Sequence, residues 1–229
     1  MLAQANLRLV TPQRSLLREA LALITATLLL TSCGTAEDEE PQVVAPPPTM
    51  EETTPEPVSY ELGQDFHLET AEGADITVTI PATAPQVDAM RTELGIDPVS
   101  YASATVDNRE GTVRVNMYQV ALYDEEGKEY LFDSASGPIG DWSPNWDWPE
   151  GGEPTYSLQD GTVITEAQYE DLNSRAGDLY NANLSDVEPL AQGEILLIGP
   201  ADLPESVTGV AVQPSGMGEP YYATPSDQQ

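Results

Sequence analysis

Beyond residue 58 the chain consists mainly of short runs rich in β-branched and aromatic residues, separated by turn residues. The run Asp75–Ile80 shows the pattern well, because Ile76, Val78 and Ile80 alternate with polar residues, as in a strand with one buried face. Similar runs near the end read "GEILLIG", "VTGVAV" and "EPYYA". Several such strands, mostly antiparallel by their turn lengths, predict an all-β fold of two packed sheets, a β-sandwich.

The middle of the chain predicts a strand pair. The segment "PVSYASATVDN" leads through "REG" into "TVRVNMYQVALYD", which indicates two long strands joined around Asn108–Gly111. The alternation changes phase between Met117 and Val120, so we expect a bulge near Tyr118 or burial on both faces. The next segment, "DEEGKEYLF", predicts a turn through Gly127 into another strand.

Two segments have helical spacing instead. "APQVDAMRTELGID" predicts a helix that begins near Pro85 and stops at Gly95. A second helix should begin at Thr165, which forms a capping-box pattern with Gln168.

The segment "YASATVDNREGTVRVNMYQVALYDEEGKEY" resembles the immunoglobulin-like domain of secreted actinobacterial lipoproteins, near the telokin-like and immunoprotective extracellular protein group. The matching features are turn-and-strand signals: Val106-Asp107-Asn108 before a Gly turn, "VNMYQV", and the "VEPLAQGEILLIGP…LP" ending. The resemblance covers roughly residues 60–224. It implies an immunoglobulin-like antiparallel β-sandwich with one or two short helices over residues 58–229, and it indicates no particular activity.

The N-terminal segment has the pattern of a targeting signal. Three arginines in residues 8–18 precede an apolar run over residues 20–30, which is too short to span a membrane. Leu30-Thr31-Ser32-Cys33 then resembles the bacterial lipobox, which implies cleavage after residue 32 and a diacylglycerol-bearing Cys33. The alternative is a buried cysteine in a membrane or core helix, which the acidic residues that follow oppose.

Residues 34–57 contain seven acidic residues, six prolines and no basic residue. Such a composition buries too little apolar surface to fold. We therefore expect residues 1–32 to be a lipoprotein signal peptide, residues 33–57 to be a lipidated cysteine with a disordered tether, and residues 58–229 to be the folded domain.

Charge and residue counts exclude several functions. From Cys33 onward the chain has 38 acidic and five basic side chains, a net charge of −33, which opposes nucleic-acid binding. His67 is the only histidine and Cys33 the only cysteine, so neither a His/Cys metal cluster nor a Cys-His dyad can form. No phosphate-binding glycine motif is present, which argues against nucleotide binding. We expect His67 to be structural or exposed. We also expect that the protein binds no cofactor and is not an enzyme.

Two uses of the abundant carboxylates stay open. A glycosidase-type pair is possible in principle, but no spacing singles out two residues. Calcium is the other use, with Asp107 in "DNREG" and Asp124 in "DEEG" as weak candidates. Both segments lack the ligand order of an EF-hand and are more simply turns.

All three tryptophans of the chain, Trp142, Trp146 and Trp148, fall within "DWSPNWDWPE". They are either loop residues that pack over the edge of the domain or an aromatic platform for sugar rings or a partner protein.

These observations predict a protein anchored through Cys33 to the outer face of the cell membrane. It would have a non-catalytic binding role toward an envelope protein or glycan. The alternative function is a cell-surface enzyme, or enzyme accessory, that acts on envelope glycans.

Overall fold

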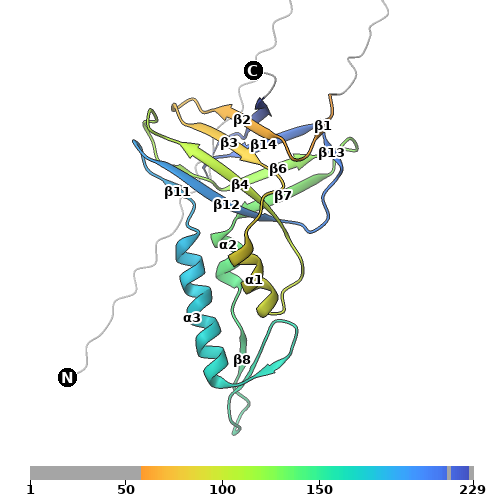
Figure 1. Ribbon diagram of the computed structural model, residues 1–229. Helices are drawn as coiled ribbons and strands as arrows, with labels where there is room; N and C mark the ends of the chain where they lie inside the picture. Colours follow the sequence, from red (N-terminus) through yellow and green to blue (C-terminus); the bar gives the residue numbers. More distant parts are fainter. Residues whose placement is uncertain (1–57, 216–217, 227–229) are drawn as a thin grey trace, which may run out of the picture. The chain divides into compact units, whose positions relative to one another are not determined.

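The computed structural model describes residues 58–215 and 218–226, which form mainly β-sheet. The largest sheet has eight antiparallel strands and closes into a barrel (Figure 1). In order around the barrel, the strands are β12 (Gln192–Gly199), β4 (Ser100–Asp107), β3 (Asp75–Thr79), β2 (Asp65–Glu69), β15 (Tyr221–Pro225), β14 (Gly209–Gln213), β6 (Gln119–Tyr123) and β7 (Glu129–Ser134).

The barrel shows that the predicted immunoglobulin-like β-sandwich is wrong. A sandwich has two sheets with free edges, whereas here β7 pairs with β12, with Ser134 opposite Leu197. On the other side β15 pairs with β2, with Thr224 opposite His67. Alternating burial does not distinguish the two folds, because a closed sheet and a packed pair of sheets both bury every second side chain.

The barrel interior is filled by apolar side chains from every strand. The alternation predicted for Ile76, Val78 and Ile80 is confirmed, since all three are fully buried. The largest fully buried side chains of this interior core are Phe66, Phe132, Ile76, Ile80, Met117, Leu122, Ile195, Leu197, Val78 and Val106.

The predicted strand pair around Asn108–Gly111 is not formed. Instead β4 pairs along its whole length with β12, which lies more than 80 residues further along the chain, and with β3 on its other side. The strand after the turn is short: β5 (Val115–Asn116) pairs with β11 (Asp186–Val187) and ends before β6 begins. This break includes Tyr118, where the sequence predicts an irregularity.

The next predicted turn is confirmed, because Gly127 lies in the hairpin that joins β6 to β7. Two further small sheets lie outside the barrel. Their strands are β1 (Tyr60–Glu61) with β13 (Ser206–Val207), and β8 (Asn145–Asp147) with β9 (Thr155–Ser157) and β10 (Val163–Ile164).

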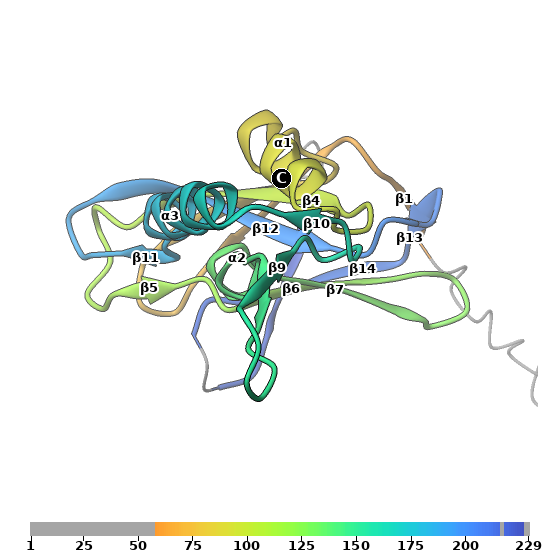
Figure 2. The same cartoon turned by 90° about the horizontal axis from the view of Figure 1, so that it is seen from below.

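Three helices pack against the outside of the barrel and form a second apolar core. They are α1 (Pro85–Glu93), α2 (Ser136–Asp141) and α3 (Glu166–Ala182). Tyr101 of β4 and Ile198 of β12 join this core from the barrel wall. Figure 2, viewed from the side of the helices, shows α1 beside β4 and α3 beside β12.

The two predicted helices are confirmed. Pro85 is the first residue of α1, and the chain leaves the helix through Gly95 with a φ of 70°, a conformation that glycine adopts readily. In α3 the Thr165 side chain accepts from the backbone N–H of Gln168, and the Gln168 side chain accepts from the backbone N–H of Thr165, which completes the capping box. The short helix α2 was not expected, because its sequence contains two glycines and a proline.

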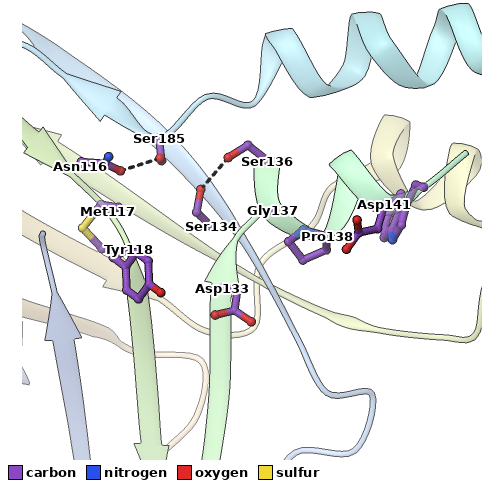
Figure 3. A pocket seen from close by; sticks show the side chains of 11 residues that line it. Asn116, Met117, Tyr118, Asp133, Ser134, Ser136, Gly137, Pro138, Asp141 and Ser185 are labelled. Atoms are coloured by element: carbon purple, nitrogen blue, oxygen red, sulfur yellow. Dashed lines mark hydrogen bonds between the residues drawn. The ribbon is translucent and has the colours of Figure 1, made fainter. Parts of the chain in front are cut away.

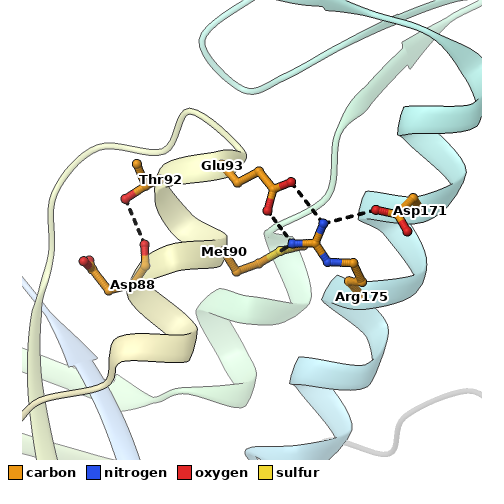
Figure 4. Close-up of polar contacts among 6 residues, drawn as sticks. All are labelled: Asp88, Met90, Thr92, Glu93, Asp171 and Arg175. Atoms are coloured by element: carbon orange, nitrogen blue, oxygen red, sulfur yellow. Dashed lines mark hydrogen bonds and ion pairs between the residues drawn. The ribbon is translucent and has the colours of Figure 1, made fainter.

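Helices α1 and α3 are joined by one arginine (Figure 4). Arg175 Nη1 donates to Glu93 Oε1 at 3.0 Å, and Nη2 pairs with the other oxygen of the same carboxylate. Arg175 Nη1 also contacts Asp171 Oδ2 at 3.1 Å, one turn earlier on α3. The guanidinium beside Glu93 lowers the pKa of that carboxyl group below its ordinary value.

The predicted signal peptide 1–32 and the predicted tether 33–57, which includes Cys33, lie outside the described residues. Among the helices that the structure describes, none has the length and apolar character needed to cross a membrane.

Candidate functional site

The three tryptophans do not act as one group. Trp142 is only 7% exposed and belongs to the core between the helices and the barrel, whereas Trp146 is 60% and Trp148 67% exposed. Trp142 follows the last residue of α2, and its backbone N–H donates to the Ile139 carbonyl. From the sequence, loop packing and a binding platform are alternatives for the whole segment. The structure assigns packing to Trp142 and leaves Trp146 and Trp148 accessible.

Trp146 lies in the small sheet formed by β8, β9 and β10, which extends away from the barrel beyond the helices (Figure 1), and Trp148 follows the last residue of β8. The register places Trp146 opposite Tyr156 of β9, and Tyr156 opposite Ile164 of β10. Trp148 comes two residues after Trp146, so the alternation of an extended chain places both indoles on the same face. We call Trp146, Trp148 and Tyr156 the aromatic face.

Contacts of Tyr156 and Ile164 attach the small sheet to the rest of the domain. The Tyr156 ring packs on Tyr169 of α3 with 4.8 Å between ring centroids, and Ile164 packs against the second core. The side-chain amide of Asn145 donates to the Leu158 carbonyl at 3.2 Å, which ties β8 to the chain that follows β9. These contacts hold the base of the sheet and leave the two indoles in water.

The charge around the aromatic face is of one sign. From Glu129 to Ser174 the chain has ten acidic residues and no Lys, Arg or His. Asp147, Glu150 and Glu153 are exposed in or next to the hairpin that joins β8 to β9. The sheet therefore presents apolar rings inside a negative field.

A pocket of about 650 Å³ lies between the end of β7, the helix α2 and the chain that precedes β6 (Figure 3), and we call it the α2 pocket. It is lined by eleven residues, none of them basic. The lining residues with chemical groups of interest are Asn116, Tyr118, Asp133, Asp141, Trp142 and Ser185.

The hydroxyl and amide groups of the α2 pocket are largely paired with one another. Ser185 Oγ donates to Asn116 Oδ1 at 2.8 Å, and the hydroxyls of Ser134 and Ser136 are 3.2 Å apart. Asp133 Oδ1 accepts from the side-chain amide of Gln119 at 2.9 Å. In the described part of the chain, the Asp141 carboxylate has neither a hydrogen-bond partner nor an ion-pair partner.

The two weak calcium candidates are occupied by protein groups. Asp107 forms an ion pair with Arg109 that lowers the pKa of the Asp107 carboxyl to about 2. Asp124 Oδ1 accepts from the backbone N–H groups of Glu126 and Lys128, each at 2.9 Å, as in an Asx turn. Within residues 58–215 and 218–226, no group of three His, Cys, Asp or Glu side chains has a geometry that could hold a metal ion.

His67 lies on the barrel wall in β2. Its Nε2 is 3.1 Å from Asp75 Oδ1, and its Nδ1 is 3.5 Å from Thr77 Oγ1. It lines neither the α2 pocket nor the aromatic face. These contacts fit the structural role expected for it.

Sequence reasoning missed the α2 pocket because its residues come from three separate segments, 116–118, 133–142 and 185. In the sequence, the one notable feature of Asp141 is that it is an acidic residue next to the tryptophans. Only the fold brings it near Tyr118 and Asp133, so no local signal could have found the pocket.

No family model, no curated protein and no solved structure matches this chain.

Proposed function

We propose that the protein is a lipid-anchored binding protein on the outer face of the cell membrane, and that it binds basic segments of other envelope proteins on its aromatic face. The observation that carries this proposal is the exposure of Trp146 in β8 of the projecting sheet and of Trp148 directly after that strand. Large aromatic side chains exposed side by side are typical of docking surfaces, where tryptophan often dominates the binding energy.

Charge complementarity selects a basic partner. The indole face attracts cations better than the rings of Tyr or Phe do, and the carboxylates of Asp147, Glu150 and Glu153 lie close in the chain. A segment rich in Arg and Lys would use both features, whereas a neutral glycan would use only the rings. An anionic polymer would be repelled.

The anchor rests on Leu30-Thr31-Ser32-Cys33. The test is Cys33→Ser, expressed in a bacterium fed with labelled fatty acid. The variant should contain no label and should leave the detergent phase. If it still partitions into detergent with the label attached, the anchor proposal is wrong.

Two observations support a non-catalytic role. The single histidine pairs with Asp75, and every described carboxyl group with a shifted pKa is shifted downward. The alternative of a glycan-cleaving enzyme draws on the two carboxylates that line the α2 pocket. A general acid for that reaction needs a carboxyl group that apolar surroundings keep protonated, whereas both of these carboxylates belong to exposed residues.

The binding test uses the chain with Cys33→Ser and a short Arg- and Lys-rich peptide, with a neutral oligosaccharide and an acidic peptide as comparison ligands. We expect the basic peptide to shift the tryptophan fluorescence, and we expect Trp146→Ala with Trp148→Ala to weaken its binding at least tenfold, about 1.4 kcal/mol. The matched control is Tyr222→Ala, which removes an aromatic ring that is 70% exposed on β15.

Two results would contradict the proposal. Peptide binding that survives the double substitution would show that the ligand binds elsewhere on the acidic surface. Saturable binding of the oligosaccharide, with no binding of the basic peptide, would make the aromatic face a sugar platform.

A further inference from the structure

The geometry points to a second binding site, independent of the aromatic face: we propose that the α2 pocket binds a small aliphatic amine. With a volume of about 650 Å³, the pocket is within the range of small-molecule sites. It opens beside the barrel wall, between the end of β7, the helix α2 and the chain around Tyr118 (Figure 3).

The first argument is uncompensated charge. Asp133 and Asp141 both line the pocket, and neither forms an ion pair within the described residues. The five described Lys and Arg side chains are used elsewhere: Arg91 with Asp88, Arg109 with Asp107, Arg114 with Asp186, Arg175 with Glu93, and Lys128 over the Tyr130 ring. Two carboxylates in one concave site concentrate a negative potential there, which attracts a cation.

The second argument is the aromatic and apolar part of the lining. Tyr118 is 52% exposed, and its ring lines the pocket together with the buried Trp142 and Met117. Aromatic faces beside carboxylates suit an alkylammonium group, because the ring attracts the cation and the apolar wall covers the methylene groups. A metal ion would gain nothing from these rings, and the described residues contain no metal-binding group of three ligands.

The third argument is that the walls are already held in place. The Tyr118 N–H donates to the Gln213 carbonyl at 3.0 Å, and the Tyr118 carbonyl accepts from the Ser134 N–H at 3.2 Å. Ser134, Ser136, Ser185 and Asn116 are paired with one another, as described above. The groups left for a ligand are therefore the Asp141 carboxylate, the second oxygen of Asp133, whose Oδ1 already accepts from Gln119, and the Tyr118 side chain. These groups favour an ammonium donor and oppose an anion.

The test is isothermal titration of the Cys33→Ser chain at low salt with putrescine, and with 1,4-butanediol as an uncharged ligand of the same shape. We expect saturable binding of putrescine at one site and no binding of the diol. Asp133→Asn and Asp141→Asn should each weaken putrescine binding at least tenfold, and Tyr118→Ala should weaken it several-fold. Asp147→Asn is the matched control, because it removes the same charge from the projecting sheet.

Folding of each variant is checked by its thermal melt, and both pocket aspartates are on the surface, so their amides should be tolerated. Equal binding of the diol would overturn the proposal, because it would show that charge is not recognised. Putrescine binding that Asp147→Asn weakens as much as Asp133→Asn does would also overturn it, since that result indicates general attraction to an acidic protein. The double substitution of Trp146 and Trp148 should leave putrescine binding unchanged, which separates this site from the proposed docking function.

Discussion

The barrel and the projecting sheet use the same pattern of side chains with opposite results. In β3 and β7 alternate apolar side chains point into a closed interior, and Phe132 and Ile76 are fully buried there. In and directly after β8, Trp146 and Trp148 follow the same two-residue spacing, yet both indoles are mostly exposed. Alternation therefore shows which face of a strand is apolar, but the rest of the fold decides whether anything covers it.

This difference means that the barrel residues stabilise the domain, whereas the exposed indoles are available for binding. Side chains in the barrel contribute to folding because they leave water, at roughly 25 cal/mol per Å² of apolar surface. Exposed indoles contribute little to folding, and their apolar surface can be buried only by a ligand. We therefore expect the two regions to respond differently to substitution.

The largest expected effect contrasts the two regions directly. Phe132→Ala should lower the free energy of unfolding by about 3–5 kcal/mol, because it leaves a cavity in the barrel interior. Trp148→Ala removes an even larger ring and should change stability by less than about 0.5 kcal/mol. Urea unfolding of both variants measures the contrast, with Leu131→Ala, a partly exposed neighbour of Phe132, as the control. A loss for Trp148→Ala as large as that for Phe132→Ala would mean that the projecting sheet is part of the core.

The second prediction applies the same contrast within one short segment. Trp142→Ala should cost about 3 kcal/mol, because its indole is buried between the helices and the barrel. Trp146→Ala, only four residues further on, should cost less than about 1 kcal/mol. Acrylamide quenching gives an independent measurement: the fluorescence that the Trp142→Ala variant retains should be readily quenched. Poor quenching in that variant would show that Trp146 and Trp148 are covered in solution.

Local signals were enough to predict many of the elements. The capping box at Thr165 and Gln168 fixed the start of α3, and the alternation of Ile76 and Val78 identified β3. Closure of the barrel could not be predicted in this way. It depends on β7 pairing with β12, and the residues that pair lie more than 60 positions apart in the chain.

The hydrogen bonds of Asn108 explain why the strand pair predicted around Asn108–Gly111 does not form. Asn108 is fully buried, and its side-chain amide donates to the carbonyls of Val113 and Val187 at 2.9 and 3.0 Å. Its backbone N–H also donates to the Ala191 carbonyl. Besides the local contact with Val113, Asn108 thus joins the end of β4 to Val187 and Ala191, which are about 80 residues further along the chain. A simple hairpin turn would have local partners alone.

The third prediction compares a glycine substitution beside Asn108 with a glycine substitution in helix α3. A Cβ atom at Gly111 would lie 1.7 Å from Asn108 Oδ1, and Asn108 cannot move without losing its buried hydrogen bonds. Gly111→Ala should therefore cost about 1–3 kcal/mol. Gly177→Ala in the exposed interior of α3 meets no atom within 4 Å and should instead stabilise the protein by about 0.4–1 kcal/mol. Thermal melts of the two variants should shift in opposite directions, and a neutral Gly111→Ala would show that the Asn108 side chain is free to rearrange.

The smallest expected effect concerns the ion pair that joins α1 to α3. Glu93 and Arg175 are each nearly half exposed, so solvent screens their attraction, and Glu93→Gln should cost only about 0.2–1 kcal/mol at neutral pH. Arg175→Gln should cost slightly more, because Arg175 also contacts Asp171. Both losses should shrink in high salt.

The pH dependence of this pair has a definite sign. The pKa of Glu93 is lower in the folded protein than its ordinary value of 4.5, because Arg175 hydrogen-bonds to the charged form. The pair therefore contributes its full stability above pH 4.5, and that contribution disappears as the pH falls through the lower folded-state pKa. Urea unfolding of wild type and Glu93→Gln should differ at neutral pH and converge in acid. A difference that persists at low pH would mean that Glu93 supports the helices by packing, and the contact between α1 and α3 would then resemble the barrel core more than a surface ion pair.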